Sequence, residues 1–293
     1  MNAAENQSEF HRLGSVLLSP VDSAFTGQDK LMAEWKALNY TEAPDFRKAQ
    51  AEYASFESLF RERGINCFHL PNSQNASLDA IYCRDAAVAT NHGMILCSMG
   101  KSQRRTEPEI HKAFYKSAGI PILGQIKPPG TLEGGDIAWL DSHTLAVGHS
   151  YRTNEQGIRQ LKTLLAPLQI EVIVAELPHY KGPEDVFHLM SVLSPIRQDL
   201  AVVYSPLLPI GFRKLLLRRG YDLVEVPEQE FDTLGCNVLA LSPETCVLTA
   251  GNPIIAAKLK DRGLEVLEYQ GSEISIKGGG GPTCLTRPLK RTL

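Results

Sequence analysis

A strand–helix–strand unit that recurs about five times constrains the fold of this 293-residue chain more than any other feature. In each copy an apolar strand precedes a helical stretch, and a basic residue with a glycine closes the helix before a second apolar strand. The period of roughly 50–60 residues is close to that of repeat architectures. The predicted units span 201–227 and 246–269, with further strand pairs at 15–20 and 62–71, 87–91 and 116–125, and 144–150 and 164–178.

Glycines mark the ends of four predicted helices, as expected for the left-handed position after a helix C-terminus. They are Gly64, Gly119, Gly220 and Gly263. Because no linker divides the chain, we predict one domain over 1–293, with five units around an axis and their loops meeting at its centre. A doubly wound α/β sheet permits the same alternation. No G-x-G-x-x-G follows an early strand, which weakens a dinucleotide-binding role for that alternative.

Composition and charge argue against several classes of partner. With 30 Lys+Arg against 33 Asp+Glu the net charge is −3, so neither nucleic acid nor a membrane surface is an expected partner. The N-terminus is polar, without the apolar segment of a secretory signal. Six cysteines show no C-x-x-C pair, which argues against a zinc site. We expect a cytoplasmic protein that needs no cofactor and no metal.

A glycine-rich loop near the C-terminus ends in a cysteine. Four glycines at 278–281 precede Pro282, Thr283 and Cys284. Consecutive glycines destabilise helices and strands, but they let the backbone turn through positive φ and pass close to a ligand. Most of the other cysteines lie in apolar, strand-like runs typical of small buried residues. We predict that the loop presents Cys284 as a nucleophile, the alternative being a flexible tail with an incidental cysteine.

Polar residues interrupt the apolar pattern near the predicted strand ends. Asp79 and Asp85 bracket a short apolar run, Glu133 precedes two glycines and a strand, and His188 lies among apolar residues. Singly, such aspartates are often turn formers and such a histidine is often a core residue. Their order along the chain, followed by Cys284, indicates groups that converge on one axis.

The chemistry of this set indicates a cationic substrate. A cysteine and a histidine provide a nucleophile and a proton carrier. Carboxylates close to a thiol raise its pKa and disfavour the thiolate, so they are useful here only if the substrate cancels their charge. A guanidinium is planar, carries several donors and pairs bidentately with carboxylates. We therefore predict a small guanidino compound as substrate.

Five motifs follow one another along the chain. They are Leu78-Asp79-x-x-Tyr82-x-x-Asp85, Thr131-Leu132-Glu133-Gly134-Gly135-Asp136, Arg152-Thr153-Asn154, His188-Leu189 and the loop ending in Cys284. Together, and in this order, they resemble the motifs of the guanidino-modifying enzymes. The resemblance is greatest to dimethylarginine dimethylaminohydrolase, with arginine deiminase next. It implies a five-bladed α/β-propeller (pentein) of about five ββαβ-type repeats around a pseudo-five-fold axis.

The resemblance implies a role for each matching residue. Cys284 attacks the guanidinium carbon, and His188 protonates the departing amine and then activates water. Glu133, counted with the catalytic residues, and Asp85 bind guanidinium nitrogens. Asp79 shapes the substrate or orients the site.

Two arginines match residues that hold the substrate carboxylate, and two positions depart from the family pattern. Arg152 is the first of these arginines and Arg104 the second, with the adjacent Arg105 as the alternative to Arg104. Met190 stands where deiminases and amidinotransferases carry an aspartate, as expected for an enzyme that admits an alkylated nitrogen. Gly278 stands where animal-type enzymes carry an aspartate for the substrate amine, so no residue is assigned to the α-amino group.

The predicted function is hydrolysis of a C–N bond of an arginine-type guanidinium through a covalent cysteine intermediate. The favoured reaction converts methylarginine to citrulline plus an alkylamine. An arginine deiminase or dihydrolase-like enzyme is one alternative, although dihydrolases carry asparagine at the position of Asp85. A non-catalytic pentein, such as a ribosome-binding factor, is another. A homodimer is left open, and residues 26–40 are the expected lid over the site.

Overall fold

The computed structural model describes residues 6–73, 76–185 and 187–293, whose strands form five three-stranded sheets. Each sheet has a central strand with one antiparallel and one parallel neighbour. The central strands are β1 (Arg12–Leu18), β4 (Gly93–Leu96), β7 (Thr144–His149), β10 (Leu200–Val203) and β13 (Thr245–Thr249). Their antiparallel neighbours are β15 (Thr286–Thr292), β3 (Ala87–Thr90), β6 (Ile137–Asp141), β9 (Leu193–Arg197) and β12 (Leu239–Ser242).

A helix connects the central strand of each sheet to its parallel neighbour, because parallel strands need a crossover connection. The parallel neighbours are β2 (Asn66–His69), β5 (Ile122–Gln125), β8 (Glu171–Glu176), β11 (Asp222–Glu225) and β14 (Glu265–Tyr269). The helices are α1 (Val21–Ala24), α2 (Gln28–Glu34) and α3 (Phe46–Arg61) in the first unit, then α4 (Glu107–Ser117), α5 (Glu155–Leu165), α6 (Ile210–Arg218) and α7 (Pro253–Lys260).

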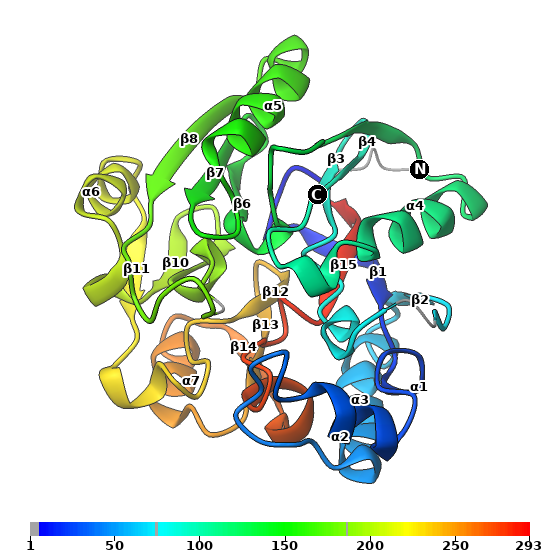
Figure 1. The fold of residues 1–293 in the computed structure, drawn as a ribbon. Helices are drawn as coiled ribbons and strands as arrows, with labels where there is room; N and C mark the ends of the chain where they lie inside the picture. Colours follow the sequence, from blue (N-terminus) through cyan, green and yellow to red (C-terminus); the bar gives the residue numbers. More distant parts are fainter. Residues whose placement is uncertain (1–5, 74–75, 186) are drawn as a thin grey trace.

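The five sheets follow one another around a ring, with the long helices on its outside (Figure 1). β15, the last strand, pairs with β1, the first, so one sheet contains both of them and closes the ring. Neighbouring sheets contact each other through β15 and β3, β6 and β9, β9 and β12, and β12 and β1. The ring therefore brings the loops before the antiparallel strands close together.

Apolar side chains fill the space between the sheets and their helices. In α3, for example, Ala49, Tyr53, Phe56 and Phe60 are buried at helical spacing, and Asp45 caps the helix by accepting from Lys48 N at 2.9 Å. All four residues of β10 are buried, as is typical of a strand covered on both faces. Among the described residues no helix is both long enough and apolar enough to span a bilayer.

Four of the five predicted parallel strand pairs are confirmed, and one is wrong. The segment 87–91 does not pair with 116–125, because β3 turns back through Asn91 and His92 and pairs antiparallel with β4. It is β4 that pairs with β5. The predicted helix-ending glycines are confirmed, since Gly64, Gly119, Gly220 and Gly263 all have φ between 67° and 84°.

Candidate active site

One narrow cavity at the centre of the ring is lined by every residue predicted for the site. Its volume is about 20 Å³, room for about one water molecule. Four further residues line it, of which Tyr82 and the glycines belong to quoted motifs and Lys101 to none. The lining residues are Asp79, Tyr82, Asp85, Lys101, Arg104, Glu133, Arg152, His188, Gly278, Gly280 and Cys284.

The predicted residues occupy similar places in successive units. Asp85, Glu133, His188 and Cys284 each lie two to five positions before the antiparallel strand of their sheet, namely β3, β6, β9 and β15. The equivalent place before β12 is held by Asn237, which sequence reasoning missed. Its position in the repeat is the signal that would have found it.

Asn237 fixes the loop that carries Cys284. Its Nδ2 donates to Cys284 Sγ at 3.3 Å, and its Oδ1 accepts from the backbone N of Thr283 at 3.0 Å. Burial, followed by the charge of Asp85, raises the pKa of the Cys284 thiol, and the hydrogen bond from Asn237 opposes this shift. The thiol is therefore protonated at neutral pH in this arrangement.

The glycine run serves mainly for close packing. Only Gly279 has a left-handed backbone, with φ 75°. A Cβ on Gly278 would lie 2.0 Å from Tyr82 Oη, and one on Gly280 would lie 2.4 Å from Tyr82 Cε1. The expected positive φ is found at Gly279, and Gly278 and Gly280 line the cavity, where the absence of a Cβ also accommodates the Tyr82 ring.

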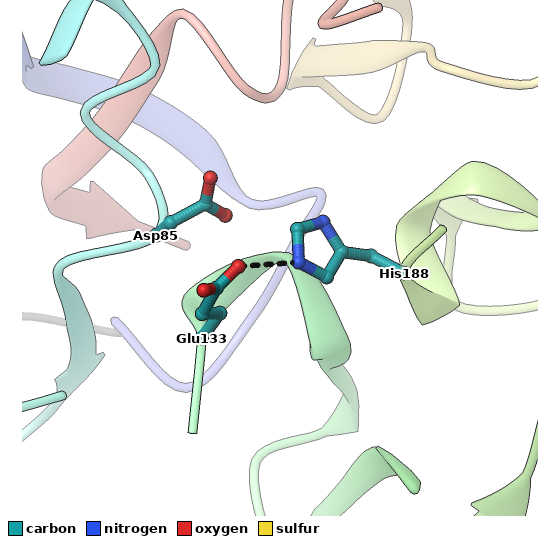
Figure 2. A group of neighbouring side chains, drawn as sticks. All are labelled: Asp85, Glu133 and His188. Carbon is teal, nitrogen blue, oxygen red and sulfur yellow. Dashed lines mark hydrogen bonds and ion pairs between the residues drawn. The ribbon is translucent and has the colours of Figure 1, made fainter. Parts of the chain in front are cut away.

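His188 and Glu133 form a buried pair that faces Asp85 (Figure 2). His188 Nε2 and Glu133 Oε2 are 2.8 Å apart. Burial lowers the pKa of the His188 imidazole, but the charges of Asp136 and Asp85 and the bond to Glu133 raise it to about 9. Burial favours the protonated Glu133, but His188 outweighs burial and lowers the pKa of this carboxyl. The pair is an imidazolium and a carboxylate at neutral pH.

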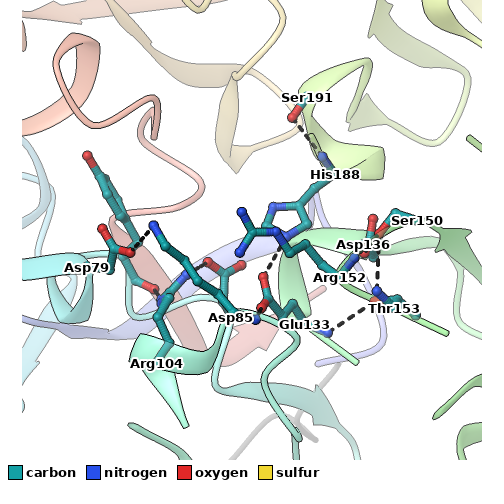
Figure 3. A network of polar contacts seen from close by, with 12 residues as sticks. Asp79, Asp85, Arg104, Glu133, Asp136, Ser150, Arg152, Thr153, His188 and Ser191 are labelled. Carbon is teal, nitrogen blue, oxygen red and sulfur yellow. Dashed lines mark hydrogen bonds and ion pairs between the residues drawn. The ribbon is translucent and has the colours of Figure 1, made fainter. Parts of the chain in front are cut away.

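The segment Glu133-Gly134-Gly135-Asp136 also orients the histidine, as part of the network in Figure 3. Asp136 Oδ1 accepts from the backbone N of Leu189 at 3.0 Å, and its Oδ2 accepts from Ser150 Oγ at 2.6 Å. A Cβ on Gly135 would lie only 2.5 Å from His188 Nδ1 and 2.8 Å from Asp85 Oδ1. The second glycine therefore lets the imidazole and the Asp85 carboxylate approach each other.

Asp85 is held by Arg104 and keeps one free oxygen. Arg104 Nη1 donates to Asp85 Oδ2 at 2.5 Å, while its Nε and Nη2 donate to Glu107 at 2.9 and 2.8 Å. Arg104 is buried whereas Arg105 is exposed, so Arg104 is the arginine that faces the cavity. Asp85 Oδ1 is buried and has no hydrogen-bond partner among the described residues. A free, buried acceptor close to Glu133 suits a guanidinium N–H.

Arg152 provides a free donor on the same cavity. Its segment is fixed because Asn154 caps α5, accepting from Gly157 N at 2.8 Å, and also accepts from Thr131 N at 3.1 Å. Arg152 Nη2 donates to the carbonyl of Asp185 at 3.2 Å. Its Nε is buried without a partner among the described residues.

Lys101 is a second residue that sequence reasoning missed. Its Nζ lies 2.7 Å from Asp79 Oδ2 and donates to the carbonyl of Leu38 at 2.8 Å. Leu38 belongs to the predicted lid at 26–40, so this segment contacts the site. Met190, in contrast, is buried in the hydrophobic core and is not among the residues that line the cavity.

The cluster of Asp85, Glu133 and His188 suits either a divalent metal or an organic cation. Their ligand atoms all lie within 4.8 Å of one another. A metal needs a neutral imidazole, whereas the raised pKa of His188 keeps it protonated. The arrangement therefore favours a planar cation held by the two carboxylates, with a thiol as nucleophile and an imidazolium as acid.

The chain is similar in sequence to several known proteins. The family model described as N,N dimethylarginine dimethylhydrolase, eukaryotic, matches residues 24–291. The uncharacterized protein YkgA of Bacillus subtilis is 31% identical over 245 residues, covering 84% of this chain and 81% of that protein. The N(G),N(G)-dimethylarginine dimethylaminohydrolase of Pseudomonas aeruginosa is 26% identical, covering 83% and 89%.

A solved structure shows the same fold. The N-terminal domain of ArgZ, a cyanobacterial arginine dihydrolase, superposes with a TM-score of 0.80 at 17% identity, covering 94% of this chain and 97% of that one.

Proposed function

This chain belongs to the N,N-dimethylarginine dimethylhydrolase family of guanidino-modifying enzymes, and we propose that it hydrolyses a guanidinium C–N bond through a covalent intermediate on Cys284. Methylarginine, giving citrulline and an alkylamine, is the substrate that the sequence motifs favour. The observation that carries the proposal is the meeting of Cys284, His188 and two guanidinium-facing carboxylates, Asp85 and Glu133, at one cavity.

Substrate binding prepares the nucleophile. The guanidinium donates to the free Oδ1 of Asp85 and lies beside Glu133. Its positive charge offsets Asp85, which is the charge that most raises the pKa of Cys284. The thiol then loses its proton to solvent, and the thiolate adds to the guanidinium carbon.

His188 serves both halves of the reaction. As an imidazolium it donates its proton to the departing amine when the C–N bond breaks, leaving a thiouronium-type intermediate on Cys284. The neutral imidazole then takes a proton from water, whose oxygen adds to the same carbon. The C–S bond then breaks, the hydroxyl on that carbon releases its proton to solvent, and the ureido product leaves as the thiolate returns. Glu133 stabilises the imidazolium throughout.

We also infer that the five sheets are the blades of a five-bladed α/β-propeller around a pseudo-five-fold axis, and that residues 1–293 form one catalytic domain. The recurrence of one site position before each antiparallel strand supports this description. Asp85, Glu133, His188, Asn237 and Cys284 would then be the five axial positions of one repeat.

A product assay tests the proposal. Purified protein is offered dimethylarginine, monomethylarginine and arginine, with ureido products and amines identified by mass spectrometry. We expect citrulline from the methylarginines and none from the Cys284→Ser variant, whereas Cys67→Ser, a half-buried cysteine outside the cavity, keeps full activity. His188→Ala should stop the release of citrulline, and any adduct trapped on Cys284 would support the role of His188 in the second step. Citrulline from arginine alone would assign a deiminase, and no product from any of them would contradict the proposed reaction.

A further inference from the structure

We propose that Lys101 disfavours an α-ammonium group, so that a guanidino acid without an α-amino group, N-methylated or not, binds more tightly than the corresponding arginine or methylarginine, which is still turned over. The inference rests on the proposed function and concerns the end of the substrate that does not react. It follows from the way in which the charged groups of the cavity are already paired.

The ammonium of Lys101 is a fixed part of the cavity wall. The side chain is 6% exposed, and its Nζ is held by Asp79 Oδ2 at 2.7 Å and by the carbonyl of Leu38 at 2.8 Å. The backbone N of Lys101 donates to Glu133 Oε1 at 3.0 Å. A buried charge pair is costly to break, because the partner left behind is an uncompensated charge. The positive charge therefore stays beside Asp79 when a substrate enters.

The cavity offers no unpaired carboxylate to an incoming ammonium. Among the described lining residues, Asp79 is paired with Lys101, and Glu133 with His188. Asp85 is paired with Arg104 through Oδ2, and its free Oδ1 faces the guanidinium subsite. Gly278 has no side chain. An α-ammonium placed near Asp79 would meet the charge of Lys101, and like charges repel strongly where water is excluded.

The free groups that line the cavity have the hydrogen-bonding character that the two ends of a guanidino acid require, although the acid itself is larger than the 20 Å³ of this cavity. Asp85 Oδ1 is a buried acceptor without a partner among the described residues, as a guanidinium requires. Arg152 Nε is a buried donor without such a partner, as a carboxylate requires. The free acceptor of Asp85, the free donor of Arg152 and the fixed ammonium of Lys101 together favour a compound that carries a guanidinium and a carboxylate but no amino group.

Calorimetric binding to the Cys284→Ser protein tests this selection without requiring turnover. The probes are arginine and des-amino-arginine, which has the same guanidinium, chain and carboxylate without the α-amino group. We expect des-amino-arginine to bind at least about tenfold more tightly. Adding Lys101→Met should remove or reverse this ratio, because Asp79 is then free to accept the α-ammonium. Lys112→Met, a half-buried lysine of α4 paired with Glu109, should leave the ratio unchanged.

A second variant covers the case in which Lys101→Met does not fold. Asp79→Asn combined with Lys101→Met removes both charges of the pair, and we expect it to bind the two probes about equally. Equal affinities in the Cys284→Ser protein, or a ratio that survives loss of Lys101, would overturn the inference.

Turnover assays of the protein with Cys284 intact, carried out on the same two compounds, test the proposed reaction separately from the proposed role of Lys101. Turnover of both compounds together with equal affinities overturns the role of Lys101 alone. A clear preference for des-amino-arginine without turnover of any guanidino compound supports the selection by Lys101 and contradicts the proposed reaction. Failure of both probes to bind contradicts both proposals.

Discussion

Two buried clusters of charge meet at Arg84 and Asp85, adjacent residues whose side chains take part in different ones. The site cluster consists of Asp79, Asp85, Lys101, Arg104, Glu133, Arg152 and His188. The closure cluster consists of Glu9, Arg84, Arg287 and Arg291, each at most 5% exposed. Both clusters combine buried carboxylates with cationic side chains, but in different proportions. This difference in composition and pairing indicates which cluster binds a ligand.

The closure cluster contains three arginines and one glutamate, and the arginines donate most of their hydrogen bonds to backbone carbonyls. Arg287 Nη1 donates to the carbonyl of Ala87 in β3 at 2.8 Å, and Arg291 Nη2 to that of Ala240 in β12 at 2.9 Å. Arg84 Nη2 donates to Glu9 Oε2 at 2.7 Å. Because these bonds link β15 to the sheets on both sides, the closure cluster joins the two ends of the ring.

Burial and mutual repulsion destabilise the charged forms of the arginines in the closure cluster. Burial is the main cause that lowers the pKa of Arg287 to about 10 and that of Arg291 to about 9, and Arg84 adds to both shifts. Burial favours the protonated Glu9, but the three arginines outweigh it and lower the pKa of this carboxyl. In the site cluster, by contrast, the free acceptor of Asp85 lines a cavity. Charge alone does not identify a site, whereas an unpaired buried group that faces a cavity does.

Glu133→Gln is expected to have the largest effect on activity. The substitution keeps the shape of the side chain but removes the charge that stabilises the His188 imidazolium. We expect kcat/KM to fall by about 10²–10⁴, measured by product formation from whichever guanidino compound is turned over. Glu109→Gln, an exposed glutamate of α4, is the control. An unchanged kcat/KM would refute the role given to the Glu133–His188 pair.

Glu9→Gln is expected to act on stability instead. It leaves three buried arginines without their carboxylate, and we expect the free energy of unfolding to drop by about 3–5 kcal/mol in urea titrations, with kcat of the folded enzyme unchanged.

The pH dependence of unfolding sharpens this prediction. A carboxyl whose pKa is lowered on folding stabilises above its unfolded pKa of about 4.3 and loses that contribution as the pH falls. The stability gap between Glu9→Gln and the unchanged protein should therefore close in acid. A gap that is constant with pH would contradict the ionised role of Glu9.

Asn237→Ala is expected to have a smaller effect, measured on the reactivity of the thiol. Loss of the hydrogen bond to Cys284 Sγ raises the pKa of the thiol further. One lost hydrogen bond predicts a decrease of roughly tenfold in the rate of alkylation by iodoacetamide at neutral pH. An unchanged rate would show that Asn237 only supports the loop.

Asp85→Asn is expected to change the same rate in the opposite direction and by only a few-fold. Asp85 is the charge that most raises the pKa of Cys284, so its removal lowers that pKa and increases the thiolate fraction. The midpoint of the alkylation rate against pH should therefore move toward acid. Glu107→Gln removes a charge from the other side of Arg104 and should leave the midpoint in place. A shift toward alkali on Asp85→Asn would contradict this account of the thiol.

Local patterns in the sequence determined most of the repeat. Apolar runs, helix-ending glycines and the order of the motifs predicted four of the five parallel pairs, and they named seven residues that line one cavity. These features depend on neighbouring residues, because strand and helix periodicity and positive φ are properties of short segments. The pairing of β3 with β4 was missed because an apolar run by itself does not specify its partner.

Only the tertiary structure decided how the charges are paired. Asp79 meets Lys101 and a carbonyl from residue 38, Asp85 meets Arg104, and Glu9 meets Arg84 across 75 positions. Pairing of β3 with β4 brings the first two pairs together, whereas Glu9 and Arg84 meet through the packing of distant segments, and neither residue type nor spacing predicts any of these pairs. The sequence by itself therefore determined the repeat and the reactive groups. The tertiary structure decided which charges are free, since only burial and distance separate a group that binds a substrate from one that is already paired.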